Sequence, residues 1–267
     1  MTESDSAVRY VEAGPPGNRR RIAVIASGSD GKATGQTIVW LGGYRSDMSG
    51  TKAMVLEAHA AKLGIPFLRF DYSGHGQSSG DYQDGTISAW LGDTRAVIDQ
   101  YAAGRQLILV GSSMGGWIAL RLIEELRKDG GATQAAGLVL IAPAPDFTHD
   151  LIEPSLTDKE RASLQEKGYF EEQSEYSSEP NRFTLALIED GRSNRVLEGL
   201  VETGCPVHIL QGMQDPDIPY RHALKIMEKI AADDAILTLI RDGDHRLSRP
   251  EDLERICAAV SAMTQTA

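Results

Sequence analysis

Cysteine is scarce in this chain of 267 residues, which has only Cys205 and Cys257. Two cysteines cannot supply a disulfide framework, and neither lies in a Cys-X-X-Cys pair or a Cys/His cluster of the kind that binds zinc. We therefore expect two core thiols in a reducing environment, no metal site and no cofactor held by these residues.

Positive charge is also in deficit. Lys and Arg number 27 against 38 Asp and Glu, so the formal net charge is −11, which argues against nucleic acid as a partner. No apolar run approaches the ~20 residues that a membrane span requires, so we expect no stable membrane insertion. The first residues, MTESDSAVRYVEAG, have neither the apolar centre of a signal peptide nor the pattern of a transit peptide. We expect a cytoplasmic location.

Short apolar strands alternate with helical segments along most of the chain. Strands are predicted at 8–11, 21–26, 37–41, 67–70, 107–110, 137–141, 207–210 and 236–240, and helices at about 52–63, 86–101, 117–127, 220–231 and 250–263. This alternation is typical of βαβ units, which form a mostly parallel sheet with helices on both faces. The predicted fold class is therefore α/β, with ligands bound beyond the carboxyl ends of the strands.

The alternation stops between residues 146 and 203, where the sequence is strongly acidic and shows helical patches but no buried strand. A structureless segment of this length is rare in a compact domain. We therefore expect 146–203 to form an inserted helical cap over the sheet edge, with 1–145 and 204–267 as the core. Five apolar residues would line the pocket beneath the cap or pack its helices together: Tyr169, Phe170, Tyr176, Phe183 and Leu187.

The motif QLILVGSSMGGW joins a buried strand to a helix through a sharp turn. The central residue of such a turn is strained, and the residues two before and two after it must lack side chains. Gly111 and Gly115 meet this condition around Ser113, whereas Ser112 would need a glycine where Val110 stands. The helix also directs its amino end at the turn, where N–H groups can receive negative charge. Ser113 is the predicted nucleophile, and an ordinary glycine-rich turn is the alternative.

A second glycine-rich loop, GGYRSD, follows the strand at 37–41. Such a loop can present a free backbone N–H over the carboxyl edge of the sheet, and we assign this role to Tyr44. Met114, directly after the predicted nucleophile, supplies the second N–H of an oxyanion hole. A tight turn without a catalytic role is the alternative for this loop.

A serine nucleophile requires a base, and His245 follows the last predicted strand and a glycine turn. The acid that orients this base is Asp215, in the loop after the strand at 207–210. Asp217 competes with it but lies farther from the strand end, and Asp242 and Asp244 are too close to the histidine in sequence to fold back easily. The remaining histidines are assigned structural or rim positions: His59, His75, His149, His208 and His222.

The segments LGGYRSDMSGTKA, FLRFDYSGHGQSSG and VGSSMGGWIAL resemble the α/β-hydrolases, and within them the group that contains alpha/beta-hydrolase domain protein ten. The resemblance covers roughly the first half of the chain and the loops of Asp215 and His245. Animal members of the group are mitochondrial and are described as palmitoyl-protein thioesterases and acyl-glucuronide esterases. The resemblance implies Ser113, Asp215 and His245 as a triad, with Tyr44 and Met114 as oxyanion donors.

These observations predict a cofactor-independent serine hydrolase that cleaves a carboxylic ester or an acyl thioester through an acyl-enzyme intermediate. The substrate is a small acyl ester or thioester, or an acylated protein. Two other classes stay open, because a fold does not determine a function. One is a different enzyme on the same scaffold, such as a lyase or a cofactor-free haloperoxidase, and the other is a non-catalytic ligand-binding module.

Overall fold

The computed structural model describes residues 7–28, 35–173, 179–232 and 234–265. In these residues a main sheet has the order β1-β2-β4-β3-β5-β6-β9-β10. From β4 to β10 all neighbours are parallel, whereas β1 and β2 pair antiparallel with each other and β2 pairs antiparallel with β4. The strands have these bounds: β1 Arg9–Ala13, β2 Arg20–Ser27, β3 Gln36–Leu41, β4 Phe67–Phe70, β5 Gln106–Ser112, β6 Gln134–Ile141, β9 Val207–Gly212 and β10 Ala235–Ile240.

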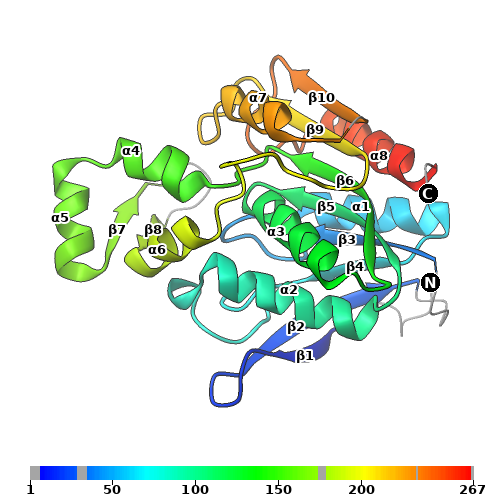
Figure 1. Ribbon diagram of the computed structural model, residues 1–267, viewed down its shortest axis with the longest axis horizontal. Helices are drawn as coiled ribbons and strands as arrows, with labels where there is room; N and C mark the ends of the chain where they lie inside the picture. Colours follow the sequence, from blue (N-terminus) through cyan, green and yellow to red (C-terminus); the bar gives the residue numbers. More distant parts are fainter. Residues whose placement is uncertain (1–6, 29–34, 174–178, 233, 266–267) are drawn as a thin grey trace.

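Helices cover both faces of the main sheet (Figure 1). The helices α1 (Thr51–Leu63) and α8 (Pro250–Gln265) pack on one face, and α2 (Ile87–Tyr101), α3 (Met114–Asp129) and α7 (Tyr220–Lys229) pack on the other. In β5, Leu107 and Leu109 join the core on one face, and Ile108 and Val110 join the core on the other. All four residues have no exposed area, which explains why the strand reads as an unbroken apolar run.

The parallel strands end level with one another. Leu41 of β3 pairs with Gly111 of β5, and Ile141 of β6 pairs with Ser112 on one side. On its other side Ile141 pairs with Leu210 of β9. The loops that follow β3, β5, β6, β9 and β10 therefore leave the sheet at the same edge, as the sequence predicts for a ligand site.

The segment between β6 and β9 extends from this edge of the sheet (Figure 1). It contains η3 (Thr148–Ile152, a π-helix), α4 (Glu153–Ser155), α5 (Asp158–Lys167), β7 (Tyr169–Glu172), β8 (Asn181–Thr184) and α6 (Leu185–Ser193). Buried Asp146 accepts hydrogen bonds from the N–H groups of Val196 (2.9 Å) and Leu197 (2.8 Å), which joins the two ends of the segment. The boundaries of this cap at 146 and 203 stay a prediction.

Besides the helices that the sequence predicts, the cap contains two short strands that it does not, because β7 and β8 form a two-stranded antiparallel sheet in which Phe170 pairs with Phe183. These strands are only four residues long and mostly polar, so they give no apolar run that a sequence pattern would detect. Phe170, Phe183 and Leu187 are buried, whereas Tyr169 is half-buried. Tyr176, the fifth apolar residue assigned to the cap, lies outside the described residues.

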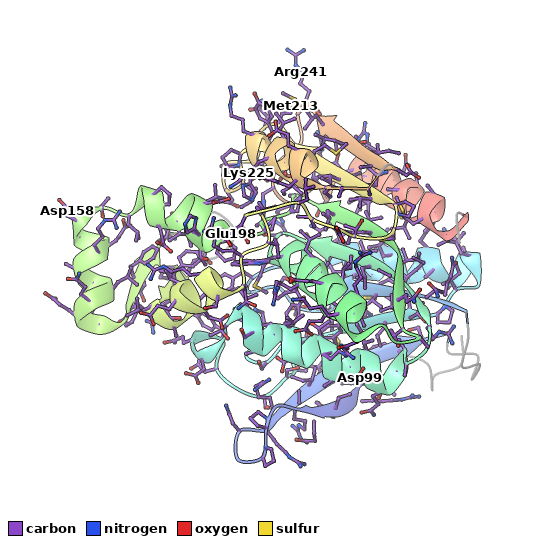
Figure 2. The ribbon with its side chains drawn as sticks, viewed as in Figure 1. Asp99, Asp158, Glu198, Met213, Lys225 and Arg241 are labelled. Atoms are coloured by element: carbon purple, nitrogen blue, oxygen red, sulfur yellow. The ribbon has the colours of Figure 1, made fainter. Side chains whose placement is uncertain are left out.

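Charged side chains project around the outside of the molecule, as Asp158 on α5 and Arg241 after β10 show (Figure 2). Within the residues that the structure describes, no helix combines the length and the apolar character that crossing a membrane would take.

Candidate active site

Ser113 lies between the end of β5 and the start of α3, with φ of 53° and ψ of −120°. This is a strained conformation for a residue with a side chain, and it matches the sharp turn that the sequence predicts. Its N–H donates to Ile141 O (2.9 Å), and its own carbonyl accepts from the N–H of Ala144 (3.1 Å). Backbone hydrogen bonds to the loop after β6 therefore hold the turn in place.

The two glycines around Ser113 are required by close backbone contacts. A Cβ atom on Gly111 would lie 2.5 Å from Gly115 O, and one on Gly115 would lie 2.0 Å from Leu41 O. Real Cβ atoms do not approach backbone this closely, so any side chain would force the strand and the helix apart. The prediction that both positions must lack side chains is confirmed.

The loop after β3 lies against Ser113. A Cβ atom on Gly43 would be 3.3 Å from the Cβ of Ser113 and 3.9 Å from its Oγ. The next N–H groups in this loop are engaged, because Arg45 N donates to His75 Nε2 (3.0 Å) and Ser46 N donates to Gly43 O (3.2 Å). Within the described residues Tyr44 N makes no hydrogen bond, which leaves its N–H available to a ligand.

Met114 is the first residue of α3. The first N–H groups of a helix have no partner inside the helix, and they carry the positive end of its dipole. The Met114 N–H, next to Ser113, is therefore suited to donate a hydrogen bond to an anion.

His245 and Asp215 form a hydrogen bond, with 2.8 Å between His245 Nδ1 and Asp215 Oδ2. The other oxygen of Asp215 accepts from the N–H groups of Asp217 (2.9 Å) and Ile218 (2.8 Å). The Asp215 side chain has no exposed area, whereas the competing residue Asp217 is exposed. A buried carboxylate held in this way orients the imidazole and fixes which of its nitrogens carries the proton.

The loops that carry Asp215 and His245 dock closely. Gln214 N donates to Gly243 O (2.9 Å), and Met213 N donates to Ile240 O (2.8 Å). A Cβ atom on Gly212 would lie 2.4 Å from Gly243 O, so this approach requires a glycine. The two loops are thus held together at the carboxyl ends of β9 and β10.

Comparison with known proteins decides the family. The model of the alpha/beta hydrolase family matches residues 38–256. The chain belongs to the alpha/beta hydrolase family. The family and the fold class that the sequence predicts are thereby confirmed, with the mostly parallel sheet described above.

Several members of this family are similar over most of their length. Palmitoyl-protein thioesterase ABHD10, mitochondrial, from Mus musculus is 34% identical over 236 residues, which cover 86% of this chain and 75% of the mouse protein. Among solved structures, the “Putative hydrolase from Agrobacterium vitis S4” is 58% identical with a TM-score of 0.92, over 97% of this chain and 98% of that chain. Alpha/beta hydrolase domain-containing protein 10 from mouse has a TM-score of 0.83 and 26% identity, over 97% and 99% of the two chains.

The expectation of a cytoplasmic location is wrong by the same comparison. The curated relatives are named as mitochondrial proteins, among them the Homo sapiens protein, which is 30% identical over 84% of this chain. Net charge and cysteine content report on solubility and redox chemistry, and neither specifies a compartment.

Sequence reasoning missed Gln211, the penultimate residue of β9. Its Nε2 donates to Asp215 Oδ2 (3.0 Å) and to Ile218 O (3.1 Å), and the residue is fully buried. Gln211 therefore supports the carboxylate that binds His245. The signal that could have found it is a polar residue at the end of an otherwise apolar strand, VHILQG.

Asp71, after β4, is a second residue that sequence reasoning missed. Its carboxylate accepts from the N–H groups of Met48 (2.6 Å) and Gln77 (2.8 Å), which links the loop after β3 to the loop after β4. Burial raises the pKa of Asp71, and the two backbone hydrogen bonds oppose this effect. Asp71 therefore anchors the segment that follows Tyr44 to the loop that carries His75.

The histidines assigned to structural positions contact protein groups. His59 contacts Ser261 Oγ (2.8 Å), and His208 contacts Thr238 Oγ1 (2.9 Å). His222 contacts Pro145 O (2.8 Å), and burial lowers its pKa. His149 contacts the Asp150 carboxylate (3.2 Å).

One group of side chains in the described residues has the spacing of a metal site. Ligand atoms of Asp215, Asp217 and His245 lie within 4.8 Å of one another. The Asp215 oxygens already accept the N–H groups of the loop and the imidazole, so a cation would compete with these hydrogen bonds. The donor set fits an acid–base pair better than a metal centre.

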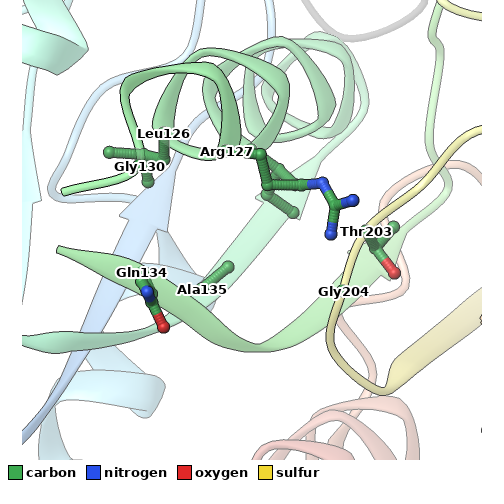
Figure 3. Close-up of a pocket in the computed structure, with 8 residues that line it drawn as sticks. Leu126, Arg127, Gly130, Gln134, Ala135, Thr203 and Gly204 are labelled. Carbon is green, nitrogen blue, oxygen red and sulfur yellow. The ribbon is translucent and has the colours of Figure 1, made fainter. Parts of the chain in front are cut away.

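A hollow of about 270 Å³ lies between the carboxyl half of α3, the start of β6 and the loop before β9 (Figure 3). Arg127 and Gly204 line it, and Arg127 pairs with Glu202 (2.8 Å). Arg127 is about 20 Å from Ser113 along the axis of α3, at 1.5 Å per residue. This hollow is therefore separate from the candidate active site.

Proposed function

We propose that this chain hydrolyses a carboxylic ester or acyl thioester through an acyl-enzyme on Ser113. The observation that carries the proposal is the strained conformation of Ser113 beside the loop after β3. A serine in such a turn exposes its hydroxyl above the sheet edge, where backbone N–H groups are available. The hydrogen-bonded His245 and Asp215 on the same edge support the assignment of a base and an acid.

His245 has to reach Ser113 past the ends of β6 and β9. Neighbouring strands are ~4.8 Å apart, so the ends of β5 and β10 are separated by about 14 Å. The segment after β10 is turned, because Gly243 N donates to Ile240 O (3.1 Å), and its hydrogen bonds with Gln214 N and Asp215 draw it toward β9. The proposal requires the His245 side chain to cover the remaining distance, so that its Nε2 accepts from the hydroxyl of Ser113.

In the first step Ser113 Oγ attacks the acyl carbonyl while His245 Nε2 takes the hydroxyl proton. Asp215 stabilises the resulting imidazolium through its hydrogen bond to Nδ1. The N–H groups of Tyr44 and Met114 bind the negative oxygen of the tetrahedral intermediate. The intermediate collapses when His245 gives its proton to the departing alcohol or thiol, which leaves the acyl group on Ser113.

In the second step His245 removes a proton from water, and the hydroxide attacks the acyl-enzyme carbonyl. Collapse of the second tetrahedral intermediate returns the proton to Ser113 Oγ and releases the carboxylic acid. No redox partner or cofactor is required, because the reaction consumes only water.

The apolar surroundings support an acyl substrate. Phe183 of the cap stacks on Tyr44 with 5.5 Å between ring centroids, and Phe147 contacts both Phe183 (6.4 Å) and Trp117 of α3 (5.6 Å). These rings connect the loop beside Ser113 to the cap through apolar contacts. The names of the relatives as palmitoyl-protein thioesterases agree with an apolar acyl group.

The test is hydrolysis of an acyl-length series, presented as matched p-nitrophenyl esters and thioesters, by the parent protein and by Ser113→Ala. We expect the parent to release the free acid from both classes and Ser113→Ala to lose several orders of magnitude in kcat. Hydrolysis by Ser113→Ala at the parent rate would contradict the proposal. Product analysis that finds no carboxylic acid would indicate a different reaction on the same scaffold.

A further inference from the structure

The turn that carries Tyr44 contains a strained residue. Ser46 N donates to Gly43 O (3.2 Å), which closes a β-turn over 43–46, and Ser46 Oγ makes a second hydrogen bond to the same carbonyl (2.9 Å). Arg45 is the third residue of this turn and has φ of 57°, a value that favours glycine or asparagine there. A contact from outside the turn is needed to stabilise Arg45 in this conformation.

His75 provides this contact. Its Nε2 accepts a hydrogen bond from Arg45 N–H (3.0 Å), and its Nδ1 lies 3.1 Å from Ser73 O. A peptide N–H only donates and a carbonyl only accepts, so the two partners select the neutral ring with its proton on Nδ1. Burial lowers the pKa of His75, which favours the same neutral form.

Neighbouring side chains immobilise the His75 ring, which is 4% exposed. It packs edge-on against Trp90 (5.5 Å between centroids) and Tyr72 (5.9 Å). Trp90 Nε1 donates to the same Ser73 carbonyl (3.1 Å), so the partner of His75 Nδ1 is itself fixed. The Nε2 acceptor is therefore held in position before any ligand binds.

The side chains of the turn also contact the cap, while the Tyr44 ring packs edge-on against His75 (6.4 Å between centroids). The Arg45 guanidinium donates to Pro180 O (2.6 Å), and the Tyr44 hydroxyl donates to Arg182 O (2.5 Å). These contacts are made by side-chain atoms and leave the backbone N–H groups of the turn to other partners. His75 is the side chain that binds a backbone N–H of this turn from outside.

We propose that His75 is a positioning residue for the oxyanion-binding N–H of Tyr44. This N–H shares a peptide plane with Gly43 O, which Ser46 fixes, and His75 fixes the following plane through Arg45 N. Without the Nε2 acceptor, Arg45 would relax toward negative φ and turn the second plane. The inference rests on the proposed function, because it gives His75 this task only if Tyr44 N–H binds an oxyanion.

The test compares two substitutions of equal length, His75→Gln and His75→Met. Glutamine can place its Oε1 where His75 Nε2 accepts from Arg45 N–H, whereas methionine cannot accept this hydrogen bond. The matched control is His208→Asn. It removes a histidine contact with Thr238 near the start of β9, at the end of the strand away from the candidate active site. The readouts are kcat and KM for a short p-nitrophenyl ester, and the inhibition constant of an acyl trifluoromethyl ketone.

We expect kcat of His75→Met to fall about 10- to 30-fold while KM changes less than about threefold, because the oxyanion is bound only in the transition state. The inhibition constant of the trifluoromethyl ketone, whose serine adduct carries an oxyanion, should rise by the same factor as kcat/KM falls. His75→Gln should retain kcat within about threefold, and His208→Asn should match the parent. If the role of His75 were merely structural, both substitutions would lower the thermal midpoint, and His75→Gln and His75→Met would have the same kcat.

Equal kcat for His75→Gln and His75→Met, with both folded at the assay temperature, would overturn the inference. If His75→Met unfolds, His75→Asn takes its place, because asparagine can keep the donor to Ser73 but is too short to accept from Arg45 N. Ser113→Ala, assayed beside these variants, separates the two claims. Its full activity would refute the proposed function, whereas its inactivity with unsplit His75 variants would refute only the role of His75.

Discussion

Replacing Asp215 with asparagine removes one negative charge and replaces one of its two accepting oxygens with an NH₂ group that donates hydrogen bonds. The Asp215 carboxylate accepts four hydrogen bonds, from the N–H groups of Asp217 and Ile218, from Gln211 Nε2 and from His245 Nδ1. An amide can offer its oxygen to only one side. Because the two backbone N–H groups cannot change, we expect the amide oxygen to face them and the amide NH₂ to face His245.

This arrangement reverses the tautomer of His245. Its Nδ1 has to accept from the new NH₂, so the ring proton moves to Nε2, which can then no longer take the proton of Ser113. The same change in a serine protease triad lowers kcat by about 10⁴-fold, and we expect a similar loss, which corresponds to about 5 kcal/mol in the activation free energy. The free energy of unfolding should fall by only about 1 to 3 kcal/mol. The cost arises because Gln211 Nε2, a donor, would face the new NH₂ group, which is also a donor, in place of a carboxylate oxygen.

The assay is kcat for an activated ester at pH 7, with the free energy of unfolding measured on the same samples. Asp217→Asn is the matched control. It removes the same charge two residues farther along the chain, at an exposed side chain. We expect the control to keep kcat within about threefold. A kcat for Asp215→Asn within tenfold of the parent, or a larger loss for Asp217→Asn, would refute the assignment of the acid.

Three further predictions concern the stability of the folded protein. The free energy of unfolding of Ser113→Gly should be about 1 kcal/mol higher than that of Ser113→Ala, since glycine adopts φ of 53° without strain. Equal stability of the two variants would contradict this reasoning. Gly115→Ala should lose more than about 3 kcal/mol by denaturant titration, because its Cβ would lie 2.0 Å from Leu41 O. Burial lowers the pKa of His222 below its ordinary value of 6.5, so the unfolded chain takes up a proton first and the unfolding free energy should fall as pH drops below 6.5. His222→Gln should reduce that slope, and an unchanged slope would show that the residue is not involved.

Local chemistry made some of the site predictable. Gly111 and Gly115 flank Ser113 because a strand and a helix can meet this closely only without side chains, and that requirement is visible in the five residues 111–115. Asp215 could be preferred over Asp217 because the first acidic residue after a strand is the one nearest the sheet edge. In both cases the signal that supports the prediction lies within a few residues in the sequence.

Contacts between distant segments made the rest unpredictable. His75 binds Arg45 N–H and Gln211 binds Asp215, and neither pairing follows from the spacing of residues along the chain. The cap strands β7 and β8 are stabilised by the pairing of Phe170 with Phe183 and by burial against the core, so their short polar sequences carry little signal of their own. Compartment was misjudged because it is not a property of the folded structure.

The central claim is that the acyl group of the substrate is transferred to Ser113 before water releases it. The direct measurement is peptide mass spectrometry of the parent protein, quenched in acid milliseconds after mixing with an acyl thioester. The account predicts an acyl group on Ser113, absent from Ser113→Ala and still present on Ser113 in Ser112→Ala. An acyl group on Ser112 or on a cysteine, or turnover by Ser113→Ala at the parent rate, would contradict it.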